Sequence, residues 1–442
     1  MEFFWNRILK KIQKFRYIIS EEKRLIMKIK RDYYLNKLIE AKNDGLIKII
    51  TGIKRCGKSY LLNEIFNEYL LENNVAADHI IKVALDDTDN VELLIPQNLS
   101  KYIKSKIIDN EVYYVILDEI QLVNNFEGLL NGLLRINNID IYVTGSNSKF
   151  LSSDIITEFR GRGEEIRVYP LSYSEFMSVF DGDKLDGWVQ YTTYGGLPLV
   201  VSMKTDERKM DYLKEQKNNV YINDVIERNN IKKDVELITL VEIISSSIGS
   251  LSNPKKLSDT FKTTVGLNID PKTISLYLKY LEEAFLIEKA NRYDVKGKKY
   301  MSTPYKFYFS DLGIRNSFIN FRQYEETHIM ENIIYLELKR RGYNVDVGVV
   351  EVNERNENDY IYKQLEIDFI ANKGNNKIYI QSAFNMPNIE KLNQEERPLL
   401  KINDSFKKII IVKDYIKRVR GENGIITMSI FDFLLDFDSL NY

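Results

Sequence analysis

The feature that most constrains the fold is a loop between an apolar segment and an amphipathic one. The segment IKIIT at 47–51 is predicted to be a buried strand, and SYLLNEIFNEYLLE after it is predicted to be a helix. The loop between them reads Gly52-Ile53-Lys54-Arg55-Cys56-Gly57-Lys58-Ser59, is followed by Tyr60, and fits the pattern G-x-x-x-x-G-K-S/T. Glycines let a backbone wrap closely around an anion, and the start of a helix adds a positive dipole. The loop therefore predicts a phosphate-binding site.

The residue types at the end of this loop match a nucleoside triphosphate and its metal ion. Lys58 is expected to reach the β- and γ-phosphates, and the Ser59 hydroxyl is expected to bind Mg²⁺. Asp118 and Glu119 follow the apolar run YYVIL. Asp118 is expected to hold the hydration shell of the metal, and Glu119 to polarise the attacking water. An acidic pair at this place also occurs as a simple helix cap, so that alternative stays open.

Two further segments contain candidate residues for the same chemistry. The segment DIYVTGSNS at 140–148 ends in small polar residues, among which Asn147 is the best candidate to sense the γ-phosphate or orient water. An ordinary turn is the alternative. Arg160 and Arg162, in FRGRG, are candidates for an arginine finger, supplied by this chain or by a neighbouring copy. A solvated pair of arginines is the competing interpretation.

Strand and helix patterns alternate from residue 47 to about residue 148, which is typical of a parallel sheet and of the α/β fold class. The other strands are expected at 79–87, 112–120 and 140–148, each with polar groups at its carboxyl end. We expect the first domain at 27–170, a helical segment at 171–250, a winged-helix region at 251–324 and a third α/β unit at 325–442.

Composition excludes several classes of protein. The 442 residues are 44% hydrophobic and 29% charged, which describes a globular protein. One cysteine and two histidines exclude an intrachain disulfide and leave little for zinc or triad chemistry. No apolar run reaches the roughly 18 residues of a membrane span. These features suit a cytoplasmic protein.

Residues 1–26 form a basic amphipathic extension. Such a helix can lie on a membrane surface, dock on the protein body, or precede an alternative start at Met27. One short amphipathic helix is a weak anchor, so membrane association is not expected.

The segment 253–287 predicts two helices joined by a turn, with Asp270 as the cap of the second. In a winged helix the second helix enters the major groove, so Lys272, Thr273, Ser275 and Lys279 are candidates for contact with nucleic acid. Glu282 and Glu283 on the same helix weaken the electrostatic case, and docking of a protein is the alternative.

The chain resembles a family of bacterial and archaeal ATPases of the AAA superfamily from about residue 27 to its end. The resemblance rests on KIKRDYYLNKL, IITGIKRCGKSYLL, VILDEIQ, YVTGSNSKFLSSDI, FRGRGEEIRVYPLSYSEF, YGGLPLV, YINDVIERN, LELKRRGYNV and EIDFIA. It implies an ATP-binding core with Mg²⁺, a winged-helix region and a carboxyl-terminal domain of restriction-endonuclease-like fold.

In such a nuclease-like domain Glu331, Asp368 and Gln381 fall where metal ligands are expected. The lysine expected two residues after Gln381 is Ala383, and Lys377 lies about 20 Å away along an extended strand. We therefore expect a degenerate domain without nuclease activity.

The sequence thus predicts Mg²⁺-dependent ATP binding and hydrolysis coupled to rearrangement of the later domains, acting on or near DNA, in a chain that can form a homo-oligomer. The alternative is a nucleotide-gated switch or a DNA-binding regulator with negligible turnover.

Overall fold

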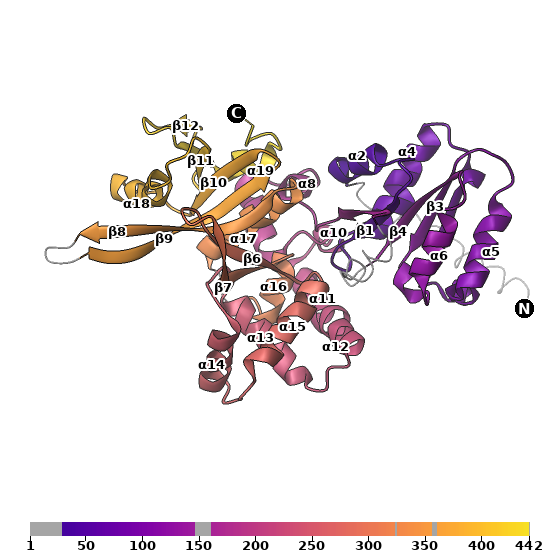
Figure 1. Cartoon of the computed structure of the whole chain (residues 1–442), viewed down its shortest axis with the longest axis horizontal. Helices are drawn as coiled ribbons and strands as arrows, with labels where there is room; N and C mark the ends of the chain where they lie inside the picture. Colours follow the sequence, from indigo (N-terminus) through magenta and orange to yellow (C-terminus); the bar gives the residue numbers. More distant parts are fainter. Residues whose placement is uncertain (1–28, 146–160, 323–324, 356–359, 442) are drawn as a thin grey trace, which may run out of the picture.

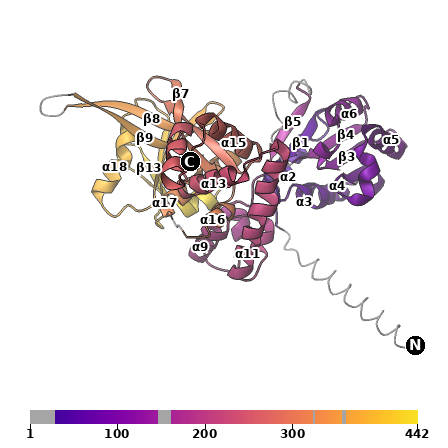
Figure 2. The same ribbon diagram turned by 90° about the horizontal axis from the view of Figure 1, so that it is seen from below.

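The computed structural model of the chain describes residues 29–145, 161–322, 325–355 and 360–441. Two sheets lie toward opposite ends of the molecule, and helices α11–α15 lie below and between them in Figure 1. Figure 2, seen from below, shows the same separation. Among the described residues, none of the helices is both long enough and apolar enough to cross a membrane. The amphipathic extension predicted at 1–26 lies outside the described residues.

The first sheet is parallel throughout, which confirms the α/β fold class. Its strand order is β2-β3-β4-β1-β5. The strands are β1 (Ile47–Thr51), β2 (Ile80–Ala84), β3 (Tyr113–Asp118), β4 (Ile139–Thr144) and β5 (Gly163–Arg167). The first four lie within the predicted segments or one residue beyond them. Strand β5 was not predicted, because an edge strand with exposed Glu164 and Glu165 has no apolar run.

Helices cover both faces of this sheet. Helices α5 and α6 supply Leu99, Ile103 and Leu130 to the core on one face. Helix α2 and the helix after the glycine-containing loop supply Leu38 and Phe66 to the other. The elements are α2 (Asp32–Glu40), α3 (Lys58–Tyr60), the π-helical η1 (Leu61–Phe66), α4 (Asn67–Glu72), α5 (Pro96–Lys106), α6 (Phe126–Leu133) and the 3₁₀ turns η2 (Ala77–His79), η3 (Thr88–Leu94) and η4 (Ile120–Leu122).

The chain from Tyr173 to Glu283 is helical. Its elements are α8 (Tyr173–Met177), α9 (Lys184–Tyr194), α10 (Pro198–Val201), α11 (Asp206–Gln216), the π-helical η6 (Lys217–Ile222), α12 (Asn223–Asn229), α13 (Asp234–Ser246), α14 (Pro254–Thr264) and α15 (Pro271–Glu283). Asp270 caps α15 by accepting from the backbone N–H of Lys272 at 2.7 Å, as its place before a proline predicts.

The second sheet is mixed and has the strand order β12-β13-β11-β10-β9-β8-β6-β7. Strands β6 and β7 form an antiparallel pair, and β6 runs parallel to β8. The hairpin of β6 and β7, which lies inside the region 251–324 predicted to be a winged helix, therefore shares one sheet with the carboxyl-terminal unit. Strands β8 and β9 project as a long ribbon (Figure 1).

The second half of the chain contains the strands of this sheet and the helices α16 to α19. They are β6 (Ile287–Asp294), β7 (Lys299–Phe309), α16 (Leu312–Phe318), α17 (Glu326–Arg340), β8 (Asn344–Arg355), β9 (Tyr360–Lys373), β10 (Asn376–Ala383), α18 (Ile389–Leu400), β11 (Lys407–Val412), β12 (Val419–Arg420), β13 (Ile426–Ser429) and α19 (Ile430–Leu435).

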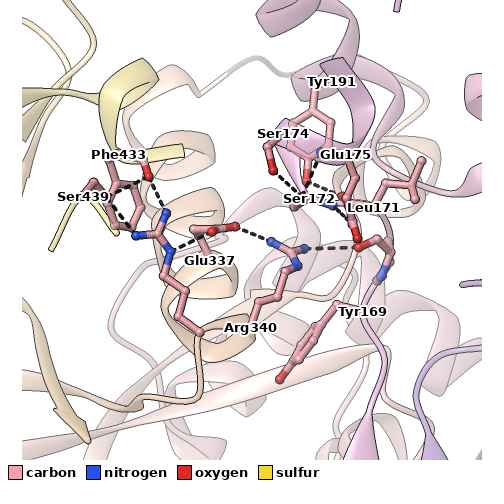
Figure 3. A network of polar contacts seen from close by, with 12 residues as sticks. Tyr169, Leu171, Ser172, Ser174, Glu175, Tyr191, Glu337, Arg340, Phe433 and Ser439 are labelled. Atoms are coloured by element: carbon pink, nitrogen blue, oxygen red, sulfur yellow. Dashed lines mark hydrogen bonds and ion pairs between the residues drawn. The ribbon is translucent and has the colours of Figure 1, made fainter. Parts of the chain in front are cut away.

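Buried arginines of α17 and the turn after it hold the junction between the two halves. Arg340 donates to the carbonyl oxygen of Pro170 at 3.2 Å and pairs with Glu337 at 2.6 Å (Figure 3). Glu337 also pairs with Arg341 at 2.8 Å, and Arg341 donates to the Ser439 hydroxyl at 2.9 Å. Glu337 is only 3% exposed, so one buried carboxylate balances two guanidinium groups.

The segment after Pro170 is fixed from the other side as well. Ser172 and Glu175 form a reciprocal capping box at the start of α8 (Figure 3). Tyr191 donates its hydroxyl to the Leu171 carbonyl oxygen at 2.8 Å, and Arg31 pairs with Glu175 at 2.9 Å. The segment that follows β5 therefore forms hydrogen bonds and ion pairs with both halves of the chain.

Replacing Glu337 with alanine leaves Arg340 and Arg341 buried without their shared carboxylate. We expect this change to lower the free energy of unfolding by roughly 3–5 kcal/mol, measured as a lower thermal midpoint by calorimetry. Glu422→Ala, at an exposed loop position, is the control and should change stability by less than about 0.5 kcal/mol. Equal midpoints for Glu337→Ala and the parent would contradict this account of the junction.

Candidate active site

The loop after β1 is shaped by two glycines in backbone conformations that other residues rarely adopt. Gly52 has φ +136°, and a Cβ atom there would lie 2.1 Å from the carbonyl oxygen of Val168. Gly57 has φ +101° and directly precedes α3. Both positions need glycine, the first for close approach of backbone and the second for its left-handed conformation. The fixed glycines of the sequence pattern thus have a steric cause.

Lys58 lies folded over this loop. Its Nζ donates to the carbonyl oxygens of Gly52 at 3.0 Å and Ile53 at 3.2 Å. The side chain is 5% exposed, although it lines an open cavity together with Ser59 and Tyr60. Neutral carbonyl groups hold the ammonium here, so an anion that entered the loop would meet an ammonium group already in place.

The end of β4 organises the acidic pair at the end of β3. The Thr144 hydroxyl donates to Asp118 and accepts from the backbone N–H of Glu119 at 2.9 Å. Glu119 has a left-handed backbone with φ 54°, and its carboxylate accepts from the side-chain amide of Gln121. The adjacent parallel strands therefore place these polar groups together, as their common edge of the sheet predicts.

A cavity of about 1000 Å³ joins the loop to the helical segment. From the first domain it is lined by Gly57, Lys58, Ser59 and other loop residues, by Glu119 and by Asp86. From η6 and α12 it is lined by Asn219, Val220, Asp224, Glu227 and Arg228. Sequence reasoning missed this second wall, because nothing in a helical pattern tells which helix will face a distant loop.

The variable positions of the loop contact the helical segment. Lys54 forms an ion pair with Asp224, which also pairs with Arg228 at 2.9 Å. The Tyr221 hydroxyl donates to the Lys54 carbonyl oxygen at 3.1 Å. Arg55 Nη1 lies 3.1 Å from the hydroxyl of Tyr212 in α11 and donates to it.

Cys56 is buried inside the loop. Its Sγ lies 3.4 Å from the Val168 carbonyl oxygen, and its own carbonyl oxygen accepts from Arg31 at 3.2 Å. Arg31 also donates to the Tyr169 carbonyl oxygen at 2.7 Å.

The remaining predicted residues of this site fall elsewhere. Asn147 and Arg160 lie outside the described residues, so their roles stay predictions. Arg162 is exposed, lies 3.4 Å from the side chain of Asn131, and is not among the described residues that line the cavity. Its role as an arginine finger also stays a prediction.

The predicted nucleic-acid contacts lie on α15. Lys272, Ser275 and Lys279 are exposed and Thr273 is half-buried. Ser275 donates to the Pro271 carbonyl oxygen at 2.9 Å, and Lys279 lies 3.7 Å from Glu283.

The nuclease-like residues meet a lysine that the sequence analysis did not consider. Lys306 of β7 is buried and pairs with Glu331 of α17 at 3.0 Å and with Glu366 of β9 at 2.8 Å. Asp368 accepts from the backbone N–H of Ser382 at 2.7 Å. An ammonium group therefore lies among these carboxylates.

Gln381 completes this cluster on β10. It neighbours Ser382, which contacts Asp368, and its buried Oε1 has no hydrogen-bond partner among the described residues. Ala383 is buried two residues later, so no lysine enters from β10. Across the described part of the chain, no group of three or more His, Cys, Asp or Glu side chains is arranged to hold a metal ion.

Electrostatics at this cluster follow from burial and from Lys306. Burial raises the pKa of Asp368, and the Glu331 carboxylate raises it further. Burial would also raise the pKa of Glu331, but the Lys306 ammonium and the His328 ring hold it below its ordinary value. Lys306 is thus the local countercharge that burial of these acids requires.

Replacing Lys306 with methionine removes this countercharge and leaves Glu331 and Glu366 beside Asp368. We expect a lower thermal midpoint, equivalent to roughly 3–5 kcal/mol, because buried charge is left unpaired. We also expect Mn²⁺ to raise the midpoint of this variant more than that of the parent, because the carboxylates are then free to bind a divalent ion. Lys299→Met, on the exposed part of the same strand, is the matched control. An Mn²⁺ effect equal in all three proteins would contradict the expectation.

Two domain families match the chain. Residues 44–177 match the AAA domain, and residues 185–325 match a domain of unknown function, DUF8612. An uncharacterized protein of Haemophilus influenzae is 34% identical over 413 residues, which cover 92% of this chain and 98% of that protein. An uncharacterized protein of Methanocaldococcus jannaschii is 27% identical over 374 residues, which cover 81% of this chain and 79% of that protein.

Among solved structures, the Aeropyrum pernix Orc1 protein in complex with DNA aligns with 66% of this chain and 92% of its own, at 12% identity and a TM-score of 0.31. The family assignment rests on the sequence matches. The chain belongs to the same family as the Haemophilus influenzae protein, and its AAA domain makes it an ATPase of the AAA superfamily.

Proposed function

We propose that the chain hydrolyses Mg²⁺-bound ATP in the cavity between the first domain and the helical segment, and that the nucleotide state moves the two relative to each other. The observation that supports this proposal is the composition of that one cavity. Lys58, Ser59 and Glu119 line it from the first domain, and Asp224 and Arg228 line it from α12. A nucleotide held there would touch both sides.

The phosphate-binding step follows from the loop geometry. Lys58 donates hydrogen bonds to the carbonyl oxygens of Gly52 and Ile53, which are neutral acceptors. A phosphate oxygen is charged and would form stronger bonds with the ammonium. We propose that Lys58 turns from these carbonyls to the β- and γ-phosphates when ATP enters.

The residues present fit a magnesium ion. Mg²⁺ prefers oxygen ligands and is usually held by one or two protein groups, waters and substrate phosphates. Ser59 provides a hydroxyl at the cavity, and Asp118 provides a carboxylate whose orientation the Thr144 hydroxyl fixes. We propose that Ser59 and Asp118 hold the ion, which when bound neutralises charge on the phosphates.

Glu119 is the proposed group that orients and polarises the attacking water. It lines the cavity beyond Asp118, and the Thr144 hydroxyl and the Gln121 amide fix its backbone and its carboxylate. A carboxylate held in this way keeps one geometry relative to the phosphate loop, which general-base catalysis needs.

Coupling to the helical segment is proposed to pass through Lys54 and Asp224. Lys54 belongs to the phosphate loop, and its side chain and carbonyl group contact Asp224 and Tyr221. Because Asp224 also pairs with Arg228 in the cavity, a change at the phosphates reaches α12 through charged groups. The helices that follow α12 would move with it.

Nucleic acid is a second proposed partner, through the exposed face of α15. Lys272, Ser275 and Lys279 lie three to four residues apart, which places them on one side of the helix. Exposed cations at this spacing suit contact with backbone phosphates.

Exchanging Glu119 for glutamine separates binding from turnover. We expect Glu119→Gln to bind ATP within about threefold of the parent and to lose turnover by roughly a hundredfold or more, because only the proton-accepting group changes. Lys58→Ala should instead lose ATP affinity, measured by calorimetry. A Lys58→Ala protein that binds and hydrolyses ATP like the parent would refute the proposed site.

Exchanging Asp224 for asparagine tests the coupling. In the parent we expect ATP to slow backbone hydrogen exchange across 217–229, because the nucleotide joins this segment to the loop. Asp224→Asn should lose this protection while its ATP affinity falls by less than about tenfold, since it removes the ion pairs with Lys54 and Arg228 and no phosphate ligand. Asp211→Asn, exposed on the preceding helix, is the control. Equal protection in Asp224→Asn and the parent would exclude this route.

A further inference from the structure

One carboxylate in the cavity between the phosphate loop and the helical segment has no part in the function proposed above. Asp86 lies two residues beyond the end of β2, is exposed, and lines this cavity together with Glu119. Within the described part of the chain, its side chain forms no hydrogen bond and no ion pair. The carboxylate of Asp86 is therefore available to a ligand.

The parallel pairing of β2 with β3 brings this residue beside the acidic pair. Ala84 lies opposite Asp118 in the register, and the backbone N–H of Leu85 donates to the Asp118 carbonyl oxygen at 3.1 Å. Asp86 follows directly after this bond. The carboxyl ends of parallel strands meet at one edge of the sheet, where open α/β sheets bind their ligands. Asp86 and Glu119 therefore belong to the same edge.

The turn after β2 fixes the backbone around Asp86. The backbone N–H of Asp87 and the side-chain amide of Asn90 both donate to the Ala84 carbonyl oxygen, at 3.3 Å and 2.8 Å. Asp87 caps the 3₁₀ turn η3 by accepting from the backbone N–H of Asp89 at 3.0 Å. Of these two neighbouring carboxylates, Asp87 stabilises the turn and Asp86 lines the cavity.

A carboxylate at this place opposes a nucleotide that arrives without a metal ion. The phosphates of ATP are strongly negative, and the Asp86 and Glu119 carboxylates are negative as well. Like charges held close together are unfavourable, whereas a divalent cation between them reverses the balance because it becomes the largest local charge. The effect of Asp86 on binding therefore depends on whether the nucleotide brings a metal ion.

Mg²⁺ suits such an arrangement because it gives up its waters reluctantly. It usually keeps several of them and is bound through one or two carboxylates and the substrate phosphates. Ser59 and Asp118 are the proposed direct ligands. Another carboxylate at the same edge can contact a metal-bound water, and groups of this outer shell tune the affinity for the ion.

We propose that Asp86 makes this site selective for the magnesium complex of the nucleotide over the metal-free nucleotide. Its carboxylate accepts a hydrogen bond from a water of the hydrated ion, and it repels the phosphates when the ion is missing. The inference rests on the proposed function, because it concerns the same cavity. It gives Asp86 a positioning and selecting role and no part in the chemical step.

The test compares Asp86→Asn with the parent by calorimetry, using the full chain and a non-hydrolysable ATP analogue. Each protein is titrated once with Mg²⁺ in excess and once with EDTA, which gives the ratio of the two affinities. Asp89→Asn is the matched control, because Asp89 is exposed, lies three residues further on, and is not among the described residues that line the cavity. Asp86→Glu keeps the charge, and thermal midpoints verify that every variant is folded.

We expect the parent to bind the magnesium complex more tightly than the metal-free analogue. Asp86→Asn should lower the ratio of the two affinities by about tenfold or more, as is typical when an outer-shell partner of a metal ion is lost. Affinity for the metal-free analogue should stay equal or rise, because one repulsive charge is gone. Asp89→Asn should behave like the parent, and Asp86→Glu should retain most of the ratio.

An unchanged ratio in Asp86→Asn would overturn the inference and leave the proposed ATP site in place. Equal losses of affinity with and without Mg²⁺ would also overturn it, since they would show that Asp86 contacts the nucleotide itself or supports the fold. If the parent bound the analogue in neither buffer, the proposed function would fail and this inference with it.

Discussion

A single buried guanidinium joins the phosphate loop to the exit from the first domain. Arg31 donates to the carbonyl oxygens of Cys56 in the loop and Tyr169 beyond β5, and it pairs with Glu175 at the start of the helical segment. The planar, permanently charged side chain can satisfy three partners in fixed directions. Arg340, from the carboxyl-terminal half, donates to the carbonyl oxygen of Pro170, which follows Tyr169 directly. A short series of contacts therefore connects the phosphate loop with the carboxyl-terminal half of the molecule. The architecture thus links the site of phosphate binding to distant parts by charge and hydrogen bonding.

The sequence predicted the first sheet and its glycine loop well, because buried parallel strands are continuous apolar runs and the loop needs particular residue types. It did not predict Thr144 as the group that orients Asp118, since its hydroxyl matters only once β3 and β4 lie side by side. It also missed Asp224, because no local pattern records that α12 faces the loop. Such contacts depend on how whole elements pack, which residue spacing along one element does not encode.

The carboxyl-terminal unit shows how a missing residue can be supplied from elsewhere. Ala383 stands where a lysine was expected, and the cation at this cluster comes instead from Lys306, on a strand far earlier in the chain. Distance along β10 was the reason to discount Lys377, but it could not reveal a lysine from β7.

Continuity of the second sheet limits how the protein can be divided. A fragment beginning at residue 325 would lack β6 and β7, and it would expose the backbone edge of β8 together with acids whose counter-ion was left behind. Open strand edges of this kind favour aggregation. The smallest carboxyl-terminal piece with an intact sheet must start upstream of Ile287, so any dissection into separately expressed parts has its natural cut among the helices that precede that strand.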